Sequence, residues 1–366
     1  IETWLTVLSA LLDLPAKQRE VFWLCVICER DREEVATKLG GTRASIAGDI
    51  NRARSALADV LRSVQQEEQD IHAERPSTSD ALRLPLERFR LAGRFDVGHL
   101  LADGEVAHLY RGVDALSNQP VAIRMLQYRY CSDPESVARF INEAHWLRTI
   151  SSDHVSQILS GGMLPGGRPY LVQQWLPISL ASVLKKGPLK ADAARAVLRQ
   201  VCRAIAALHA RGLIHRDISP AQFRMVRWAP DESSVPQAPI RLASLALAKP
   251  VGEHNARAPL PVSTSGGVLP GDWEYRAPET WVNAKHTDVR TDIYGIGALW
   301  FALLTGHPPF VRAFDESLQS LMQRCLYHQP PMTEIEDPSP LLVGSLSKDP
   351  SSRPTLAELQ NEFERD

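Results

Sequence analysis

The chain is short of cysteine and of net charge, and these shortages exclude several classes of protein. Its 366 residues include five cysteines, and formal net charge is −2. An odd, scattered set of cysteines is not a disulfide framework, so a reducing, cytoplasmic compartment is expected. A net charge this close to zero gives no global signal for nucleic acid or an anionic membrane.

Long apolar runs are also lacking. The longest, from Ile296 to Leu304, is far shorter than the roughly 20 residues that a membrane span needs, so no membrane segment is expected in this sequence. Cys25 and Cys28 form a CxxC, but no second pair of cysteines or histidines follows, which favours two small apolar residues over half a zinc site. The first residue is Ile1 rather than Met, which suggests a fragment of a longer protein that could carry a membrane anchor elsewhere.

Three regions separate along the chain. Residues 1–64 are rich in Ala, Leu, Arg and Glu and are expected to form helices. Residues 65–88 are polar, contain Pro and Ser, and are typical of a linker. From residue 89 to 366, strand-like and helix-like patterns alternate, which predicts an α+β domain.

The first region has the layout of a helix-turn-helix. Apolar residues recur with helical spacing before a tight turn at Gly40, Gly41 and Thr42, where Thr42 is the predicted N-cap. A long helix follows, with apolar positions three and four residues apart from Ile46 to Leu61. The segment resembles region 4 of sigma-70-type factors, whose second helix enters the major groove. The resemblance implies DNA-facing positions at Arg43, Ser45, Ala47, Arg52 and Arg54.

The local charge opposes a simple transfer of DNA binding. Residues 1–75 hold ten Lys and Arg against thirteen Asp and Glu, whereas DNA affinity depends largely on neutralising phosphates. Gly48 and Asp49 also fall within the expected recognition helix, where Asp49 is expected to face phosphates. Region 1–64 is therefore expected to contact a protein partner in the first place, with DNA or RNA polymerase as the alternative.

A series of motifs runs in order through the rest of the chain. They are Glu143 in ARFINEAHWL, His215-Arg216-Asp217 in HARGLIHRDISP, Ala277-Pro278-Glu279, Asp292 in TDIYGIGALW, and Arg353 in KDPSSRPTLAEL. This order and spacing resemble the serine/threonine protein kinase domain. The resemblance implies a two-lobed fold, with an N-lobe at 89–172, a joining segment at 170–177 and a C-lobe at 178–366. Helix E is expected at 191–211, with apolar positions at Ala194, Val197, Val201, Ile205 and Leu208.

The residues that hold the nucleotide in that family are only partly present. The resemblance maps the nucleotide site onto Gly104, Ala122, Arg124, Glu143 and Gln174. Ala102 and Ala107 replace the first and third glycines of the phosphate loop, where only Gly allows close backbone approach. Arg124 replaces the strand-3 lysine and is expected to pair with Glu143, chiefly as a structural ion pair.

The metal ligands and the catalytic loop have also changed. Ser244 replaces the aspartate of the DFG motif, and Gln222 replaces the metal-binding asparagine, so neither magnesium ligand is intact. Ser219 stands where the loop lysine is expected. The proton-acceptor position Asp217 and its neighbours His215 and Arg216 are retained.

The resemblance implies that Glu279 pairs with Arg353 and that Asp292 holds the catalytic loop. These scaffold residues of the family survive, while its phosphate and metal groups are lost. This division favours a pseudokinase that acts as a signalling or transcription-linked scaffold, with no cofactor expected beyond weak, metal-independent ATP binding. Two alternatives remain. One is a weak or atypical serine/threonine kinase, because Asp217 is intact. The other is a DNA-binding regulator with a kinase-like input module.

Overall fold

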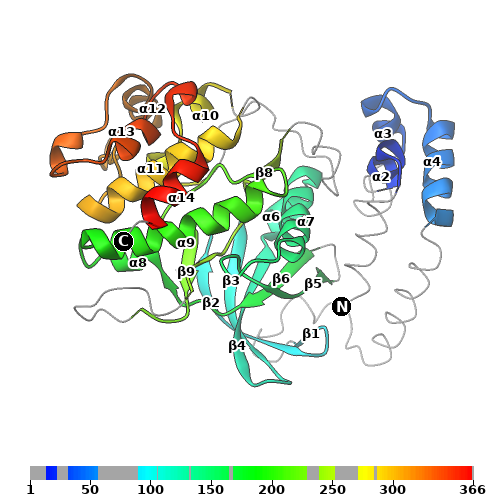
Figure 1. Ribbon diagram of the computed structural model, residues 1–366. Coiled ribbons are helices and arrows are strands. Elements are labelled where there is room, and N and C mark those ends of the chain that lie inside the picture. The colour runs from blue at the N-terminus through cyan, green and yellow to red at the C-terminus, as the bar shows by residue number, and fades with distance from the viewer. Residues whose placement is uncertain are drawn as a thin grey trace. The chain divides into compact units, whose positions relative to one another are not determined.

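The computed structural model describes residues 14–22, 32–56, 90–104, 106–131, 133–164, 168–228, 239–251, 271–283 and 287–364. It confirms the α+β class, with an N-terminal helical part followed by sheet and helices (Figure 1). Cys25, Cys28, the predicted linker and residues 252–270 lie outside the described residues.

The N-terminal part contains three described helices, α2 (Ala16–Phe22), α3 (Arg32–Lys38) and α4 (Arg43–Ala56). The predicted apolar positions Ile46 and Ile50 are buried, as is Ala53. The turn before α4 forms as expected: Gly40 takes a positive φ of 64°, and the hydroxyl of Thr42 accepts a hydrogen bond from the Ser45 N–H. Helix α4 therefore begins at a true N-cap.

The chain divides into two compact units. The first takes in the described residues up to Arg148, together with Gln157–Trp175. The second takes in Thr149–Ser156 and the described residues from Leu176 onward. The division between Trp175 and Leu176 falls inside the predicted joining segment at 170–177.

The first unit is built on a six-stranded antiparallel sheet in the order β1-β2-β3-β4-β6-β5. Alternate residues Val121, Ile123 and Met125 of β4 are buried, as expected for a strand with one face in a core. Helix α7 supplies further buried residues, including Phe140 and Leu147. The elements are β1 (Arg90–Leu91), β2 (Phe95–Asp103), β3 (Ala107–Asp114), β4 (Gln119–Leu126), α6 (Tyr128–Cys131), α7 (Pro134–Thr149), β5 (Ile158–Leu164) and β6 (Arg168–Gln174).

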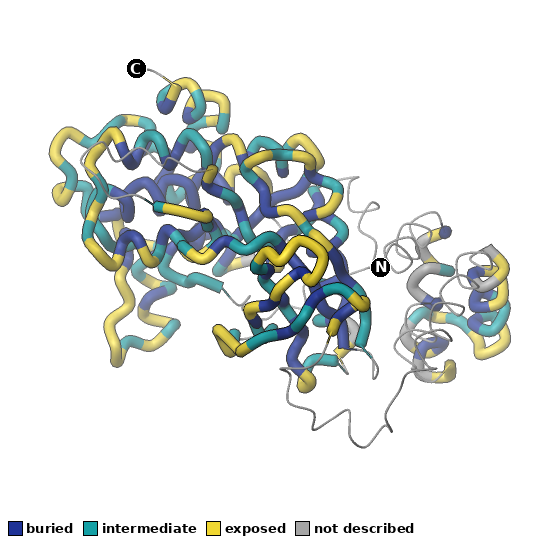
Figure 2. Tube along the Cα trace, turned by 90° about the horizontal axis from the view of Figure 1, so that it is seen from below, coloured by how far each residue is buried: buried dark blue, intermediate teal, exposed yellow. Residues whose placement is uncertain are grey.

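The second unit is mainly helical. Helix α9 (Ala191–His209) is amphipathic, and all five apolar positions expected for helix E, namely Ala194, Val197, Val201, Ile205 and Leu208, are fully buried. Helix α11 (Val289–Thr305) is buried along most of its length, begins at the Asp288 N-cap, and ends at Gly306 with a φ of 89°. Figure 2 shows buried residues along the inner stretches of the trace and exposed residues on its outer turns.

Shorter elements complete the second unit. They are β7 (Ile178–Ser179), α8 (Leu180–Leu184), β8 (Leu213–Ile214), β9 (Phe223–Met225), β10 (Arg241–Leu242), β11 (Lys249–Pro250), η4 (Trp273–Tyr275), α10 (Pro278–Asn283), α12 (Leu318–Tyr327), η5 (Met332–Glu334), α13 (Pro340–Ser345), η6 (Pro350–Ser352) and α14 (Leu356–Glu364). Across the ranges described, no helix has the length and apolar character needed to cross a bilayer.

Candidate nucleotide and phosphoryl-transfer site

The turn between β2 and β3, where the phosphate loop is expected, is closed by its own side chains. Asp103 pairs with His108 across the hairpin, with His108 Nε2 3.1 Å from the Asp103 carboxylate. The Gln127 amide donates to both Asp103 Oδ1, at 2.8 Å, and the Gly104 carbonyl, at 2.5 Å. A Cβ at Gly104 would lie 2.7 Å from the Ala107 carbonyl oxygen. Gly104 is therefore required by the turn itself.

The predicted ion pair between β4 and α7 is present. Arg124 Nη1 donates to Glu143 Oε1 at 2.6 Å, and the Glu143 side chain is 1% exposed. The Arg124 guanidinium also lies over the ring of Phe140. Ala122 lies on β4 as well, and Gln174 lies on the adjacent strand β6, paired with Val121. The first unit thus brings Ala122, Arg124, Glu143 and Gln174 onto neighbouring elements, with the Arg124 charge already paired.

The catalytic loop of the second unit is braced from within by a buried carboxylate. Asp292, fully buried on α11, accepts hydrogen bonds from the backbone N–H groups of His215, at 2.9 Å, and Arg216, at 2.8 Å. It also contacts His209 Nε2 at 2.8 Å. Burial alone would raise the pKa of Asp292, but the hydrogen bond and charge of His209 outweigh it and lower that pKa. Asp292 therefore holds the loop as predicted.

The backbone at Arg216 is unusual and is stabilised locally. Arg216 has a φ of 68°, in the left-handed region that side-chain-bearing residues rarely adopt. Its Nε donates to the Leu247 carbonyl at 2.8 Å, and His215 Nε2 contacts the Ser244 carbonyl at 2.9 Å. These two side chains tie the loop to the segment that follows β10.

Both carboxylate oxygens of Asp217 accept hydrogen bonds from the protein itself. Gln222 Nε2 donates to Oδ2 at 2.5 Å, and the Asp272 backbone N–H donates to Oδ1 at 3.0 Å. A Cβ at Gly271 would lie 2.6 Å from Asp217 Oδ1, and Gly271 has a φ of 121°, so only glycine fits there. Burial raises the pKa of Asp217, against the opposing charge of His215 and these hydrogen bonds.

A second carboxylate, Asp272, lies next to Asp217. Burial is the main cause that raises the pKa of Asp272 to about 6, and the negative charges of Asp217 and Glu274 act in the same direction. Its backbone contact with Asp217 could not be read from sequence, because 55 residues separate the two. The contacts of Gln127 with Asp103 and Gly104 could not be predicted either, because the sequence carries no local signal for them.

The positions of the two magnesium ligands are occupied by neutral groups with other contacts. The Ser244 hydroxyl accepts a hydrogen bond from the Ala246 N–H at 3.2 Å, which closes a local turn. The Gln222 amide donates to Asp217, as described. Among the described residues, no group of three or more His, Cys, Asp or Glu side chains is arranged to hold a metal ion.

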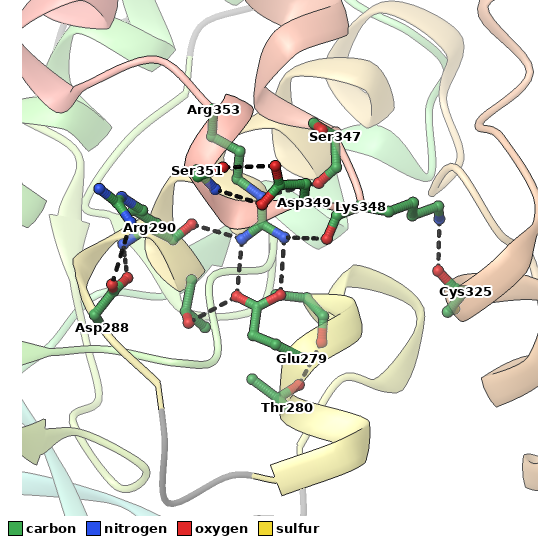
Figure 3. Close-up of polar contacts among 12 residues, drawn as sticks. Glu279, Thr280, Asp288, Arg290, Cys325, Ser347, Lys348, Asp349, Ser351 and Arg353 are labelled. Carbon is green, nitrogen blue, oxygen red and sulfur yellow. Dashed lines mark hydrogen bonds and ion pairs between the residues drawn. The ribbon is translucent and has the colours of Figure 1, made fainter.

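An ion pair at the base of the second unit joins the buried Arg353 side chain to Glu279, whose side chain is 19% exposed. Arg353 makes two parallel hydrogen bonds of 2.8 Å with the Glu279 carboxylate (Figure 3). The guanidinium also donates to the Arg290 and Ser347 carbonyls, and Thr291 donates to Glu279. Although burial opposes ionisation, the bonds from Arg353 lower the pKa of Glu279. The pair predicted from sequence is therefore present and fully satisfied.

The expected DNA-facing residues of α4 have mixed surroundings. Arg43 is exposed, and Ser45 takes part in the N-terminal cap of the helix. The expectation that Asp49 faces phosphates is wrong: Asp49 is 6% exposed, and its carboxylate pairs with Arg52 at 2.7 Å. One turn of the helix separates the two residues, so they are neighbours on its surface. The side chain of Arg54 is not among those described.

Comparison with known families matches both parts of the chain. Residues 95–363 match the protein kinase domain, and residues 4–57 match sigma-70 region 4.

Individual relatives carry kinase names. Serine/threonine-protein kinase PknL of Mycobacterium tuberculosis is 31% identical over 278 residues, which make up 74% of this chain and 65% of PknL. Serine/threonine-protein kinase Pkn1 of Myxococcus xanthus is 30% identical over 267 residues, 71% of this chain and 36% of Pkn1. A second Myxococcus xanthus kinase, pkn2, is 33% identical over 221 residues, 60% of this chain and 25% of pkn2. The chain thus spans less than two thirds of each of these relatives.

Proposed function

Because this chain belongs to the protein kinase family, we propose that it is a pseudokinase, a catalytically impaired relative of bacterial serine/threonine kinases that acts as a signalling or transcription-linked scaffold. Its kinase fold would serve to bind partners, and its sigma-region-4 segment would connect it to a protein of the transcription machinery. The residues on which this proposal rests are the Asp217 loop and the altered nucleotide and metal positions.

The hydrogen bond between Gln222 and Asp217 supports this proposal most directly. In the family, the residue at position 222 holds a metal ion, and the carboxylate at 217 accepts the proton of the substrate hydroxyl. Here the first group donates to the second at 2.5 Å, and the Asp272 N–H occupies the other oxygen. The acceptor is thereby engaged by the protein, which leaves it poorly placed to receive a proton.

The groups present do not fit a magnesium–nucleotide complex. Magnesium prefers carboxylate and phosphate oxygens, whereas Ser244 offers a neutral hydroxyl. On the other unit, Arg124 is committed to Glu143. Asp103 places a carboxylate beside the turn that would have to receive phosphates. We therefore assign no phosphoryl-transfer step, and expect at most weak ATP binding that does not depend on metal.

A thermal-shift titration of the full chain with ATP, with and without Mg²⁺ or Mn²⁺, tests the proposal. A nucleotide that binds the folded state raises its stability by about 2.7 kcal/mol at a concentration 100 times its Kd. We expect no metal-dependent stabilisation at millimolar ATP. Metal-dependent stabilisation together with autophosphorylation that is lost in Asp217→Asn would overturn it.

A restored variant makes the test sharper. Arg124→Lys, Gln222→Asn and Ser244→Asp together return the strand-3 lysine and the two metal ligands of the family. If their loss is what impairs the protein, the triple variant gains stabilisation by Mg-ATP that the natural chain lacks. The same triple variant carrying Asp217→Asn is the matched control, because it should bind Mg-ATP equally but transfer no phosphate.

A weak or atypical serine/threonine kinase is the second candidate. The relatives named as kinases favour it, as does the intact bracing of His215, Arg216 and Asp217 by Asp292. Incorporation of labelled phosphate into a generic substrate by the natural chain, but not by Asp217→Asn, would select this candidate over the first.

A further inference from the structure

The second unit contains a cavity formed by elements other than the catalytic loop. Its volume is about 360 Å³, at the small end of the range of ligand sites. Its walls come from the start of α9, the end of α11, α13, α14 and the segment 334–339. Nothing in the proposed function uses this cavity.

The cavity combines an apolar wall with an acidic one. Trp300 and Leu304 of α11 and Phe363 of α14 line the apolar side, and the Trp300 and Phe363 rings meet edge to face, 4.7 Å apart. Four carboxylates line the other side, three of them within the segment 334–337. Arg195 is the only lysine or arginine among the described residues that line it.

Two of the carboxylates have no cationic partner among the described residues. Glu334 pairs with His307 at 2.8 Å, and Glu362 accepts a hydrogen bond from the Ser339 hydroxyl at 3.3 Å. Glu336 and Asp337 are exposed at the rim and form no ion pair within the part of the chain that the structure describes. Like charges this close repel one another, so a cation placed between them would be stabilised.

The partial charges at the helix ends do not change the sign of the electrostatic potential in the cavity. Leu304 lies in the last turn of α11, whose carbonyl end carries partial negative charge. Ala191 begins α9, whose N–H end carries partial positive charge. These two contributions oppose each other, so the excess of carboxylates over Arg195 decides the potential.

We propose that this cavity binds a cation carried on an apolar stem, an alkylammonium or alkylguanidinium group. The stem would lie along Trp300 and Leu304, and the charged head would reach Glu336 and Asp337. A lysine or arginine side chain of a peptide and a free polyamine share this chemistry. The site does not depend on phosphoryl transfer, so its test is separate from the test of the proposed function.

Calorimetric titration of the full chain tests the site with four probes of similar stem length: hexylammonium, butylguanidinium, neutral hexanol and anionic hexanoate. We expect saturable binding of the two cations at about millimolar concentration, the affinity range of ligands this small. Hexanol should bind more weakly and hexanoate not at all. Equal binding of hexanoate, or no saturation by either cation, would overturn the proposal.

The variant Glu336→Gln with Asp337→Asn removes both unpaired charges while keeping the size of the side chains. Asp337 has a φ of 50°, a conformation that asparagine tolerates well, so the segment should keep its shape. Cation binding should weaken by about tenfold or more, as for the loss of a charge-assisted hydrogen bond. Unchanged affinity in this variant would contradict the assignment.

Asp153→Asn is the matched control, because Asp153 is an exposed carboxylate of the same unit that does not line the cavity. It should bind the cations like the natural chain. The source of the cation is then distinguished by two further probes, spermidine and an N-acetylated arginine peptide amide. Tighter binding of the peptide identifies a protein segment as the natural ligand, and tighter binding of spermidine identifies a polyamine.

Discussion

The charged residues at the base of the second unit and the carboxylate of Asp217 differ in the kind of partner that they contact. At the base, Arg353 makes two hydrogen bonds with Glu279, and Asp292 accepts hydrogen bonds from the backbone of the loop that it braces. Asp217 also accepts a hydrogen bond at each carboxylate oxygen, but from the Gln222 side chain and the Asp272 backbone.

Two arginines expected to contact ligands are paired with carboxylates of the chain. Arg124 is paired with Glu143, and in the N-terminal helices Arg52 is paired with Asp49. Each of these two arginines contacts a carboxylate of its own chain. The contacts that brace the second unit are complete, and the charges of Arg124 and Arg52 are both paired.

The largest effect is expected at the Arg353–Glu279 pair. Arg353→Met should lower the free energy of unfolding by about 3–5 kcal/mol, because it leaves the Glu279 carboxylate without its buried partner. Urea denaturation of the full chain, followed by near-UV circular dichroism, measures this loss.

Arg203→Met is the matched control for that experiment. Arg203 pairs with Glu364 at 2.7 Å, but both side chains are 48% exposed. An exposed pair contributes about 0–1 kcal/mol, so this variant should unfold almost like the natural chain. Similar losses in the two variants would mean that burial does not distinguish them.

A substitution beside Asp217 is expected to raise the free energy of unfolding instead of lowering it. Asp272 has its pKa raised from 3.8 to about 6, so its contribution to stability is fully present below pH 4 and is lost as pH rises through 6. Asp272→Asn removes this penalty and keeps the backbone N–H that contacts Asp217. It should stabilise the protein at pH 7.5 by up to about 3 kcal/mol, the equivalent of that shift.

The pH dependence separates this cause from others. Melting temperatures of Asp272→Asn and the natural chain should differ at pH 7.5 and converge near pH 4, where the carboxyl is neutral in both states. The Asp272 side chain makes no capping hydrogen bond to η4, so its loss removes no cap. A difference that stays constant with pH would show that the Asp272 charge is not the cause.

Much of this arrangement could be predicted from the sequence. Helical spacing indicates which residues of one helix are buried, and the family motifs imply which charged residues pair. The heptad-like spacing of α9 predicted its five buried residues, and the family motifs predicted the pairs Arg353–Glu279 and Arg124–Glu143. Contacts set by the chain path could not be predicted. Gly271 and Asp272 reach Asp217 from a distant segment.

Asp49 shows a different limit of the sequence. Its place on the helix was predicted correctly, but its direction was not, because a carboxylate three residues before Arg52 can either face outward or fold back onto the guanidinium. Helical spacing alone does not distinguish these two arrangements, since both keep the residues on one face. In the folded-back arrangement the Asp49 carboxylate is buried, while the Arg52 guanidinium stays exposed and is paired with it.

The smallest effect on stability, and the one that tests the N-terminal comparison, is expected for Asp49→Asn. The pair spans one helical turn, so its loss should change the free energy of unfolding by about 0.2–0.5 kcal/mol.

Arg52, whose side chain is 61% exposed, would then be free to contact a phosphate. Gel shifts of the full chain on promoter DNA at several salt concentrations should show a salt slope steeper by about one for Asp49→Asn. Glu33→Gln, an equal charge change on α3, should leave the slope unchanged; equal slopes in all three proteins would mean that Asp49 does not silence Arg52.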